Sequence, residues 1–165
     1  MLTAEQWLEL HTVCLDTVRG AIAGLPSAAM AVTPWPNGDS IGEQVNHVIG
    51  AELYWLGEVG IQPAFTEIAP PDWTEAAFVA EFSKIERQYR SILAAKGLDA
   101  DILFGLGRVS QHALYHYVKV AESRRVLEPG WEAPGWPGSG SWERAVDLVT
   151  DLLILGPEAR PHDTA

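Results

Sequence analysis

Two of the five histidines stand four residues apart, at His112 and His116. In an α-helix this spacing places both imidazoles on one face, about one turn apart, where they can chelate one metal ion. A helical wheel places His116 within the apolar face of its segment and His112 at the edge of that face. The face is formed by Val109, Ala113, Val120 and Leu127. Burial and mutual repulsion would disfavour charged rings there, and a metal would keep both neutral. The alternative is a chance pair of structural histidines, which are common on helix faces.

A third metal ligand must come from another segment, and two residues between positions 40 and 59 compete for the role. His47 lies in the middle of that segment, whereas Glu52 lies nearer the centre of its apolar face. A buried carboxylate without a partner is costly, so Glu52 requires a metal, a histidine or a cationic side chain beside it. The residue pattern alone leaves both candidates open.

Other polar residues near these segments have two interpretations each. Arg108 precedes His112 by one turn, so it either binds a carboxylate or phosphate of a substrate or is a solvated residue at the helix start. His11 lies on the core stripe of the first predicted helix, where it is a hydrogen-bonded core histidine or orients a metal ligand. Cys14, in the same stripe, is interpreted as a small buried hydrophobic residue rather than a nucleophile.

Two tryptophans, Trp131 and Trp136, stand in a loop rich in glycine and proline. Three interpretations stay open for them: an aromatic lid over the metal pocket, anchors that pack the loop on the helices, or part of a dimer surface.

The segments that must position these residues read as helices separated by proline- and glycine-rich loops. Capping boxes at Thr3 and Ser40 begin the first two helices, which end near residue 25 and near Val59. The remaining expected elements are a third helix capped by Asp72 and ended by Gly97, a connector over 98–107, a fourth helix over 108–127 and a short fifth helix over 141–156.

This order of elements predicts an all-α fold, a four-helix bundle with long connections and a short extra C-terminal helix. We expect one domain over residues 1–157 and a frayed tail over 158–165. The long connections predict crossovers, or loops that form a pocket at one end of the bundle.

Composition excludes several classes of protein. The chain has 165 residues, of which 47% are hydrophobic, as expected for a globular protein. Its net charge of -11 argues against binding of nucleic acid or an anionic membrane through a general electrostatic field. A single cysteine excludes an internal disulfide framework. No signal peptide or membrane-spanning stretch is seen, so we expect a cytoplasmic protein.

Two motifs together resemble the DinB/YfiT-like family of damage-inducible bacterial proteins. The stretch SIGEQVNHVIGAELYWL, residues 40–56, resembles the second-helix motif of that family, in which an acid follows a histidine by five residues. The stretch HALYH, residues 112–116, resembles its H-x3-H motif, and the pair Arg124 and Arg125 matches the pair usually found downstream. The similarity covers the order and lengths of the helices over nearly the whole chain.

The resemblance implies a divalent metal held by three histidines in a four-helix bundle. Here these would be His47, His112 and His116, which favours His47 over Glu52 as the third ligand. Imidazoles suit several transition metals, of which we expect zinc or nickel. Characterised relatives use low-molecular-weight thiols, such as bacillithiol or mycothiol, in S-transfer or isomerisation. Homodimers are frequent among them, and the family is linked to stress responses.

The chain departs from the family after its second motif histidine, where relatives often carry x-Gly-Gln. Here Lys119 stands in place of the glutamine. A hydrogen bond that the glutamine would make to the site is therefore in question. Lys119 instead offers a cation for an anionic substrate.

These observations favour a metalloenzyme acting on a small molecule, and the resemblance implies a thiol-dependent S-transferase. Glu52 would be its catalytic acid, relaying protons, and Arg108 and Lys119 would bind substrate. The alternatives are a metal-dependent hydrolase and a non-catalytic metal- or ligand-binding protein that acts as a dimer.

Overall fold

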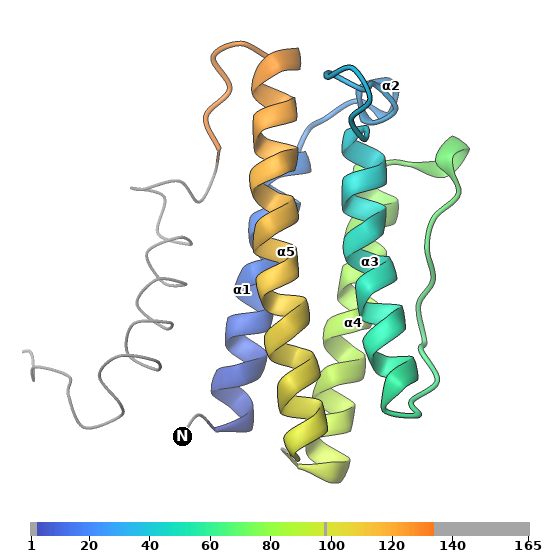
Figure 1. Ribbon diagram of the computed structural model, residues 1–165, viewed down its shortest axis with the longest axis vertical. Helices are drawn as coiled ribbons and strands as arrows, with labels where there is room; N and C mark the ends of the chain where they lie inside the picture. The colour runs from blue at the N-terminus through green and yellow to red at the C-terminus, as the bar shows by residue number, and fades with distance from the viewer. Residues whose placement is uncertain (1–2, 98, 134–165) are drawn as a thin grey trace, which may run out of the picture.

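The computed structural model describes residues 3–97 and 99–133, and every regular element in these ranges is a helix. The long helices lie side by side, with α5 packed against α1 and α3, and with α4 packed against the same two helices (Figure 1). They are α1 (Ala4–Ile22), α3 (Ile41–Glu58), α4 (Glu75–Lys96) and α5 (Ala100–Leu127). The predicted all-α class is confirmed for the described part of the chain. The expected helix over 141–156, the tail over 158–165 and Trp136 lie outside it.

Both predicted capping boxes are confirmed. The Thr3 hydroxyl accepts a hydrogen bond from the Gln6 amide, and the Gln6 side chain accepts one from the Thr3 amide. Ser40 and Glu43 make the same reciprocal pair at the start of α3. Each box satisfies two amide groups that a helix N-terminus leaves without an intrahelical partner. The second box fixes the start of α3, and hence the position of His47 along it.

The start of the third predicted helix differs from expectation. Asp72 does not cap it but ends the short 3-10 helix η1 (Pro70–Asp72), and the helix that follows is capped by Thr74, which accepts from the Ala77 amide. The adjacent prolines lack amide donors and have fixed φ angles, so they favour a separate tight turn before the helix begins. The predicted end is confirmed, because Gly97 takes a positive φ of 71° at the end of α4.

The predicted connector over 98–107 is wrong, because α5 begins at Ala100 and has 28 residues. Asp99 caps it by accepting a hydrogen bond from the Ile102 amide. Glycines at 105 and 107 suggested a loop, yet both lie within the helix. Gly105 is buried, and a Cβ there would lie 3.9 Å from the Trp55 Cβ, so tertiary packing next to α3 outweighs the low helix propensity of glycine. The connection from α4 to α5 is therefore short.

The connection from α1 to α3 and the one from α3 to α4 also carry structure. The first, expected as a loop, contains the short helix α2 (Ser27–Met30), whose Met30 is fully buried. The second packs on α3 through Trp73, whose ring lies so close to Gly42 that a Cβ there would be 2.2 Å from a ring carbon. Gly42 is thus required for this close approach. None of the described helices combines the length and apolar character that crossing a membrane requires.

A buried arginine joins the C-terminal end of α5 to the end of α1. The Arg124 guanidinium donates to the carbonyl oxygens of Ala21 and Ala23, both at 2.8 Å, and to the Glu128 carboxylate at 3.0 Å. It also lies 4.6 Å from the centre of the Trp131 ring. Among the three interpretations of Trp131, this contact favours an anchor that packs the loop on the helices.

Candidate metal centre

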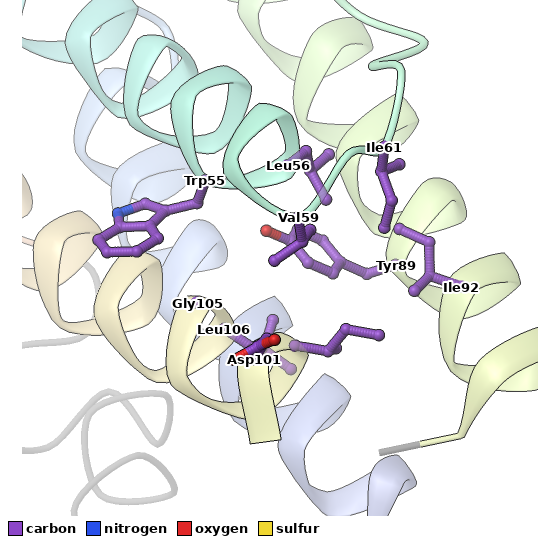
Figure 2. A pocket seen from close by; sticks show the side chains of 10 residues that line it. Trp55, Leu56, Val59, Ile61, Tyr89, Ile92, Asp101, Gly105 and Leu106 are labelled. Carbon is purple, nitrogen blue, oxygen red and sulfur yellow. The ribbon is translucent and has the colours of Figure 1, made fainter. Parts of the chain in front are cut away.

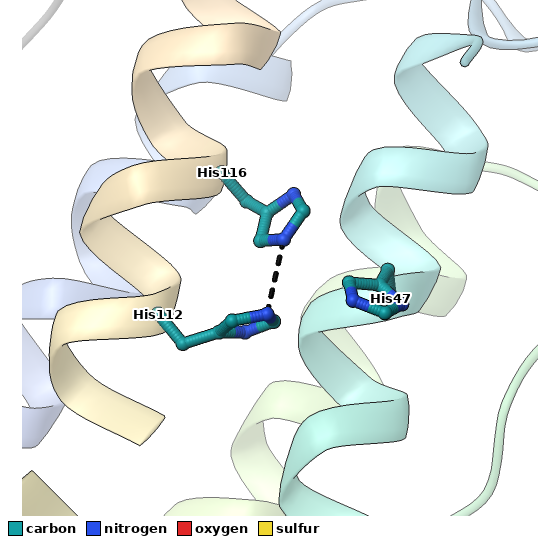
Figure 3. Close-up of side chains that lie close together, drawn as sticks. All are labelled: His47, His112 and His116. Carbon is teal, nitrogen blue, oxygen red and sulfur yellow. Dashed lines mark hydrogen bonds between the residues drawn. The ribbon is translucent and has the colours of Figure 1, made fainter. Parts of the chain in front are cut away.

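Three histidines from two helices face one another (Figure 3). His47 comes from α3, and His112 and His116 come from α5; one nitrogen of each lies within 4.8 Å of the other two. We call these residues the histidine trio. The Nε2 atoms of His112 and His116 are 3.1 Å apart. With metal–nitrogen distances of about 2.0–2.1 Å, two atoms at that separation subtend about 100° at a shared ion, between the octahedral and tetrahedral angles. This spacing fits a divalent transition metal shared by His112 and His116, and His47, whose nitrogen lies within 4.8 Å of both, would reach the same ion by a small movement of its exposed side chain.

The histidine trio is graded in exposure. His116 is buried at 5% exposure, His112 is half-buried and His47 is exposed. The centre is therefore anchored in the interior at one end and open to solvent at the other. Three protein ligands with access from solvent leave coordination positions for an external molecule, which is the arrangement of catalytic rather than structural zinc sites.

The electrostatics of the trio favour the neutral, ligating form of its rings. Burial, followed by positive charge on His112, His47 and Lys119, lowers the pKa of His116 to about 3. The pKa of His112 is lowered chiefly by burial, then by His47 and Arg108. A neutral imidazole offers a lone pair to a cation, whereas imidazolium does not.

His116 has a hydrogen-bond partner that sequence reasoning missed. Its Nδ1 lies 2.5 Å from the side-chain oxygen of Gln44, a buried residue of α3. The Gln44 amide nitrogen in turn donates to the carboxylate of Asp39. The available signal was position: Gln44 precedes His47 by three residues, so both lie on one face of the same helix.

A pocket of about 240 Å³ lies beside the histidine trio and contains one of its members. It is lined by Trp55, Arg108, Gln111, His112 and Tyr115. Arg108, predicted to bind substrate, is thus in the same pocket as a predicted metal ligand. Lys119 lies with its ammonium 4.7 Å from the centre of the Tyr115 ring, on the same stretch of α5. The roles of Arg108 and Lys119 in substrate binding stay predictions.

Glu52 is not a member of the histidine trio. It is fully buried and has the partners that its burial was expected to require: its Oε2 accepts from the Tyr89 hydroxyl at 2.9 Å, and its Oε1 lies 3.3 Å from Nε2 of His11. His11 Nδ1 lies 3.2 Å from Ser110 Oγ, and the Ser110 hydroxyl donates to the Leu106 carbonyl. His11 therefore donates to Ser110 and offers its Nε2 lone pair to Glu52. We call His11, Glu52, Tyr89 and Ser110 the buried network.

Burial controls protonation in this network. It raises the pKa of Glu52 to about 8, and, followed by the charge of Arg19, it lowers the pKa of His11 to about 3. A protonated Glu52 carboxyl and a neutral His11 ring, with Oε1 and Nε2 3.3 Å apart, avoid placing two charges in the interior near neutral pH. Burial, followed by the charge of Glu52, raises the pKa of the nearby Cys14 thiol to about 12. Cys14 is fully buried, which confirms that it is a small core residue. The catalytic role of Glu52 stays a prediction.

A second, much smaller crevice borders the buried network at Tyr89 (Figure 2). Its volume is about 10 Å³, enough for roughly one water molecule. Most of its lining is apolar, including Leu56, Ile92 and Leu106. Trp55 lines both this crevice and the larger pocket, and so separates them. The larger pocket is the better candidate for a substrate.

No family model, curated protein or solved structure matches the chain.

Proposed function

We propose that the chain is a divalent-metal-dependent enzyme, and specifically a thiol-dependent S-transferase. The observation that carries this proposal is the convergence of three imidazoles from two helices beside an open pocket. A structural metal site is typically closed by four protein ligands, whereas the histidine trio supplies three and His47 is exposed. An open site of this kind favours catalysis over a purely structural role.

The histidine trio would hold the ion through neutral imidazoles. When bound, such an ion acts as a Lewis acid that lowers the pKa of a thiol or of water and so makes a nucleophile available near neutral pH. Two cationic residues near the histidine trio would position the substrate. Arg108 would bind an anionic group from its place in the pocket beside His112, and Lys119 would add positive charge nearby.

Charge favours an anionic substrate at this site. The trio is uncharged in its ligating form, so a divalent ion together with Arg108 and Lys119 would add positive charge beside the pocket, although the whole chain carries a net charge of -11. An anionic thiol or an anionic electrophile would offset that charge.

The choice of thiol transfer over other reactions is supported by the resemblance of residues 40–56 and 112–116 to the DinB/YfiT-like motifs. We propose accordingly that α1, α3, α4 and α5 form the four-helix bundle of that family. We also propose that the protein acts as a homodimer.

The decisive assay combines zinc- or nickel-loaded protein with a low-molecular-weight thiol and an alkylating electrophile. We expect the rate of thioether formation to exceed that of metal-free protein, and His116→Ala to abolish the excess. The same preparations are offered an activated ester without thiol. Hydrolysis of the ester with no thiol transfer would favour a hydrolase, and metal binding with neither rate would favour a non-catalytic metal-binding protein; both results contradict S-transfer.

A further inference from the structure

His112 and His116 differ in how their Nδ1 atoms are held. Nδ1 of His116 is 2.5 Å from the Gln44 side-chain oxygen. Nδ1 of His112 is buried and has no hydrogen-bond partner among the described residues. Only one ligand of α5 is therefore fixed in orientation by a protein group, and that ligand is also the most buried of the three.

The orientation of the Gln44 amide is set from its other end. Its nitrogen donates to the Asp39 carboxylate, a group that can only accept. The amide oxygen must then face His116 and accept from Nδ1–H. This places the proton of His116 on Nδ1 and leaves the lone pair on Nε2, the atom that faces His112. Asp39 is exposed and Gln44 is buried, so the chain of hydrogen bonds runs from the surface into the centre.

The proton positions of His112 follow from the same bonds. A hydrogen bond between the two Nε2 atoms, 3.1 Å apart, needs one proton. Because His116 carries its proton on Nδ1, the donor is His112. Coordination of an ion between the rings requires both Nε2 lone pairs, so His112 must change tautomer and carry its proton on Nδ1, while His116 is already in the ligating tautomer.

We propose that Asp39 and Gln44 form a positioning relay that holds His116 in the ligating tautomer and makes it the anchored ligand of the metal centre. The inference rests on the proposed metal site and extends it to the residues that control metal affinity. Partners of this kind fix ring orientation and increase the basicity of the ligating nitrogen, and their loss typically weakens metal binding about 10–100-fold. Gln44 and Asp39 are positioning residues, since neither is placed to contact the ion or a substrate.

The test measures zinc affinity by competition with a chromophoric chelator. Gln44→Leu removes the acceptor and is expected to weaken zinc binding about 10–100-fold. The double variant Asp39→Asn/Gln44→Glu reverses the polarity of the outer bond, since the new amide can donate to the new carboxylate while that carboxylate accepts from His116. We expect it to recover most of the affinity. Gln88→Leu is the matched control, because Gln88 also makes two hydrogen bonds but lies on α4, which carries none of the trio.

A spectroscopic measurement separates positioning from general stability. In ¹⁵N-labelled metal-free wild-type protein, the imidazole spectrum should show His116 with its proton on Nδ1 and His112 with its proton on Nε2. Zinc should leave the His116 tautomer unchanged and alter that of His112. Gln44→Leu should remove the tautomer preference of His116, whereas a loss of stability alone would leave it intact.

Three results would overturn the relay: zinc affinity of folded Gln44→Leu equal to that of the wild type, an equal loss in Gln88→Leu, or a metal-free His116 with its proton on Nε2. Should Gln44→Leu fail to fold, the zinc affinity of the double variant and the His116 tautomer of the wild-type protein still test the relay. Failure of the wild-type protein to bind zinc would instead contradict the proposed function and the relay with it. Normal zinc binding by Gln44→Leu contradicts the relay alone.

Discussion

The histidine trio and the buried network both contain imidazoles packed between helices, yet their surroundings differ. The network draws one residue from each long helix: His11 from α1, Glu52 from α3, Tyr89 from α4 and Ser110 from α5. The trio uses only α3 and α5, and its outer member is exposed. One cluster therefore joins all the long helices in the interior, and the other lies at an edge between two of them.

The two clusters differ more in the partners of their imidazole nitrogens than in residue type. In the buried network each polar side chain faces another protein group, and the histidine nitrogen Nε2 lies 3.3 Å from the Glu52 carboxyl oxygen Oε1. In the trio, imidazole nitrogens face one another, an arrangement that a cation satisfies better than a single hydrogen bond does. A buried histidine that faces a carboxyl group is thus explained by the fold, whereas histidines that face each other call for a ligand.

A reciprocal pair of alanine substitutions tests most strongly whether the two clusters have different roles. His116→Ala should remove nearly all bound zinc and leave the protein folded. His11→Ala should leave zinc binding intact but lower the free energy of unfolding by about 1–3 kcal/mol, because it leaves the buried Glu52 carboxyl without its histidine. Zinc content by elemental analysis and unfolding in urea are measured on both. The distinction fails should His11→Ala lose zinc as completely as His116→Ala while it remains folded.

The pH dependence of stability sharpens the account of the buried network. Glu52 has a folded-state pKa of about 8 against an ordinary value of 4.5, so its stabilising contribution is full below 4.5 and is lost as the pH rises toward 8. His11 has a folded-state pKa of about 3 against 6.5, so its contribution is lost as the pH falls from 6.5 toward 3. Between 4.5 and 6.5 the two slopes cancel. We therefore expect a plateau of stability with a decline on each side.

The alkaline decline can be isolated with Glu52→Gln. The amide cannot ionise, so the difference in free energy of unfolding between variant and wild type should change between pH 6.5 and 8 in favour of the variant. Urea unfolding at a series of pH values gives this difference directly. A difference that stays constant across that range would show that Glu52 is already ionised in the folded protein.

The smallest effect is expected at the rim of the metal centre. Arg108→Gln removes an exposed charge from the pocket, so stability and zinc affinity should change little. Binding of an anionic thiol to the zinc-loaded protein should weaken about fivefold, corresponding to about 1 kcal/mol for an exposed charge pair. A neutral thiol of similar size serves as the control in titration calorimetry. Equal losses for both thiols would remove Arg108 from anion recognition.

Much of the fold could be predicted because its signals are local. Capping boxes at Thr3 and Ser40 and the positive-φ glycine at the end of α4 act within one helical turn, and each is confirmed. The start of α5 was missed because Gly105 and Gly107 weigh against a helix locally. The proximity of Gly105 to Trp55, which lies far away in the sequence, is not visible in that local pattern.

For the candidate site too, the residues that a local pattern links could be predicted, and those that depend on tertiary contacts could not. Spacing on one helix brought out His112 and His116, but the helical wheel left His47 and Glu52 undecided. Their separation depends on which neighbouring helix each one faces: His47 lies at the open edge beside α5, and Glu52 points toward α1 and α4. Gln44 was missed for the same reason, since its partner is 72 residues away.

X-ray absorption at the zinc edge of the loaded wild-type protein tests the shared coordination most directly. Three imidazole nitrogens at about 2.0–2.1 Å from the ion, with at least one further light-atom ligand from outside the chain, are the predicted result. A spectrum without imidazole scattering, or with a single imidazole among carboxylate oxygens, would contradict coordination of one ion by His47, His112 and His116.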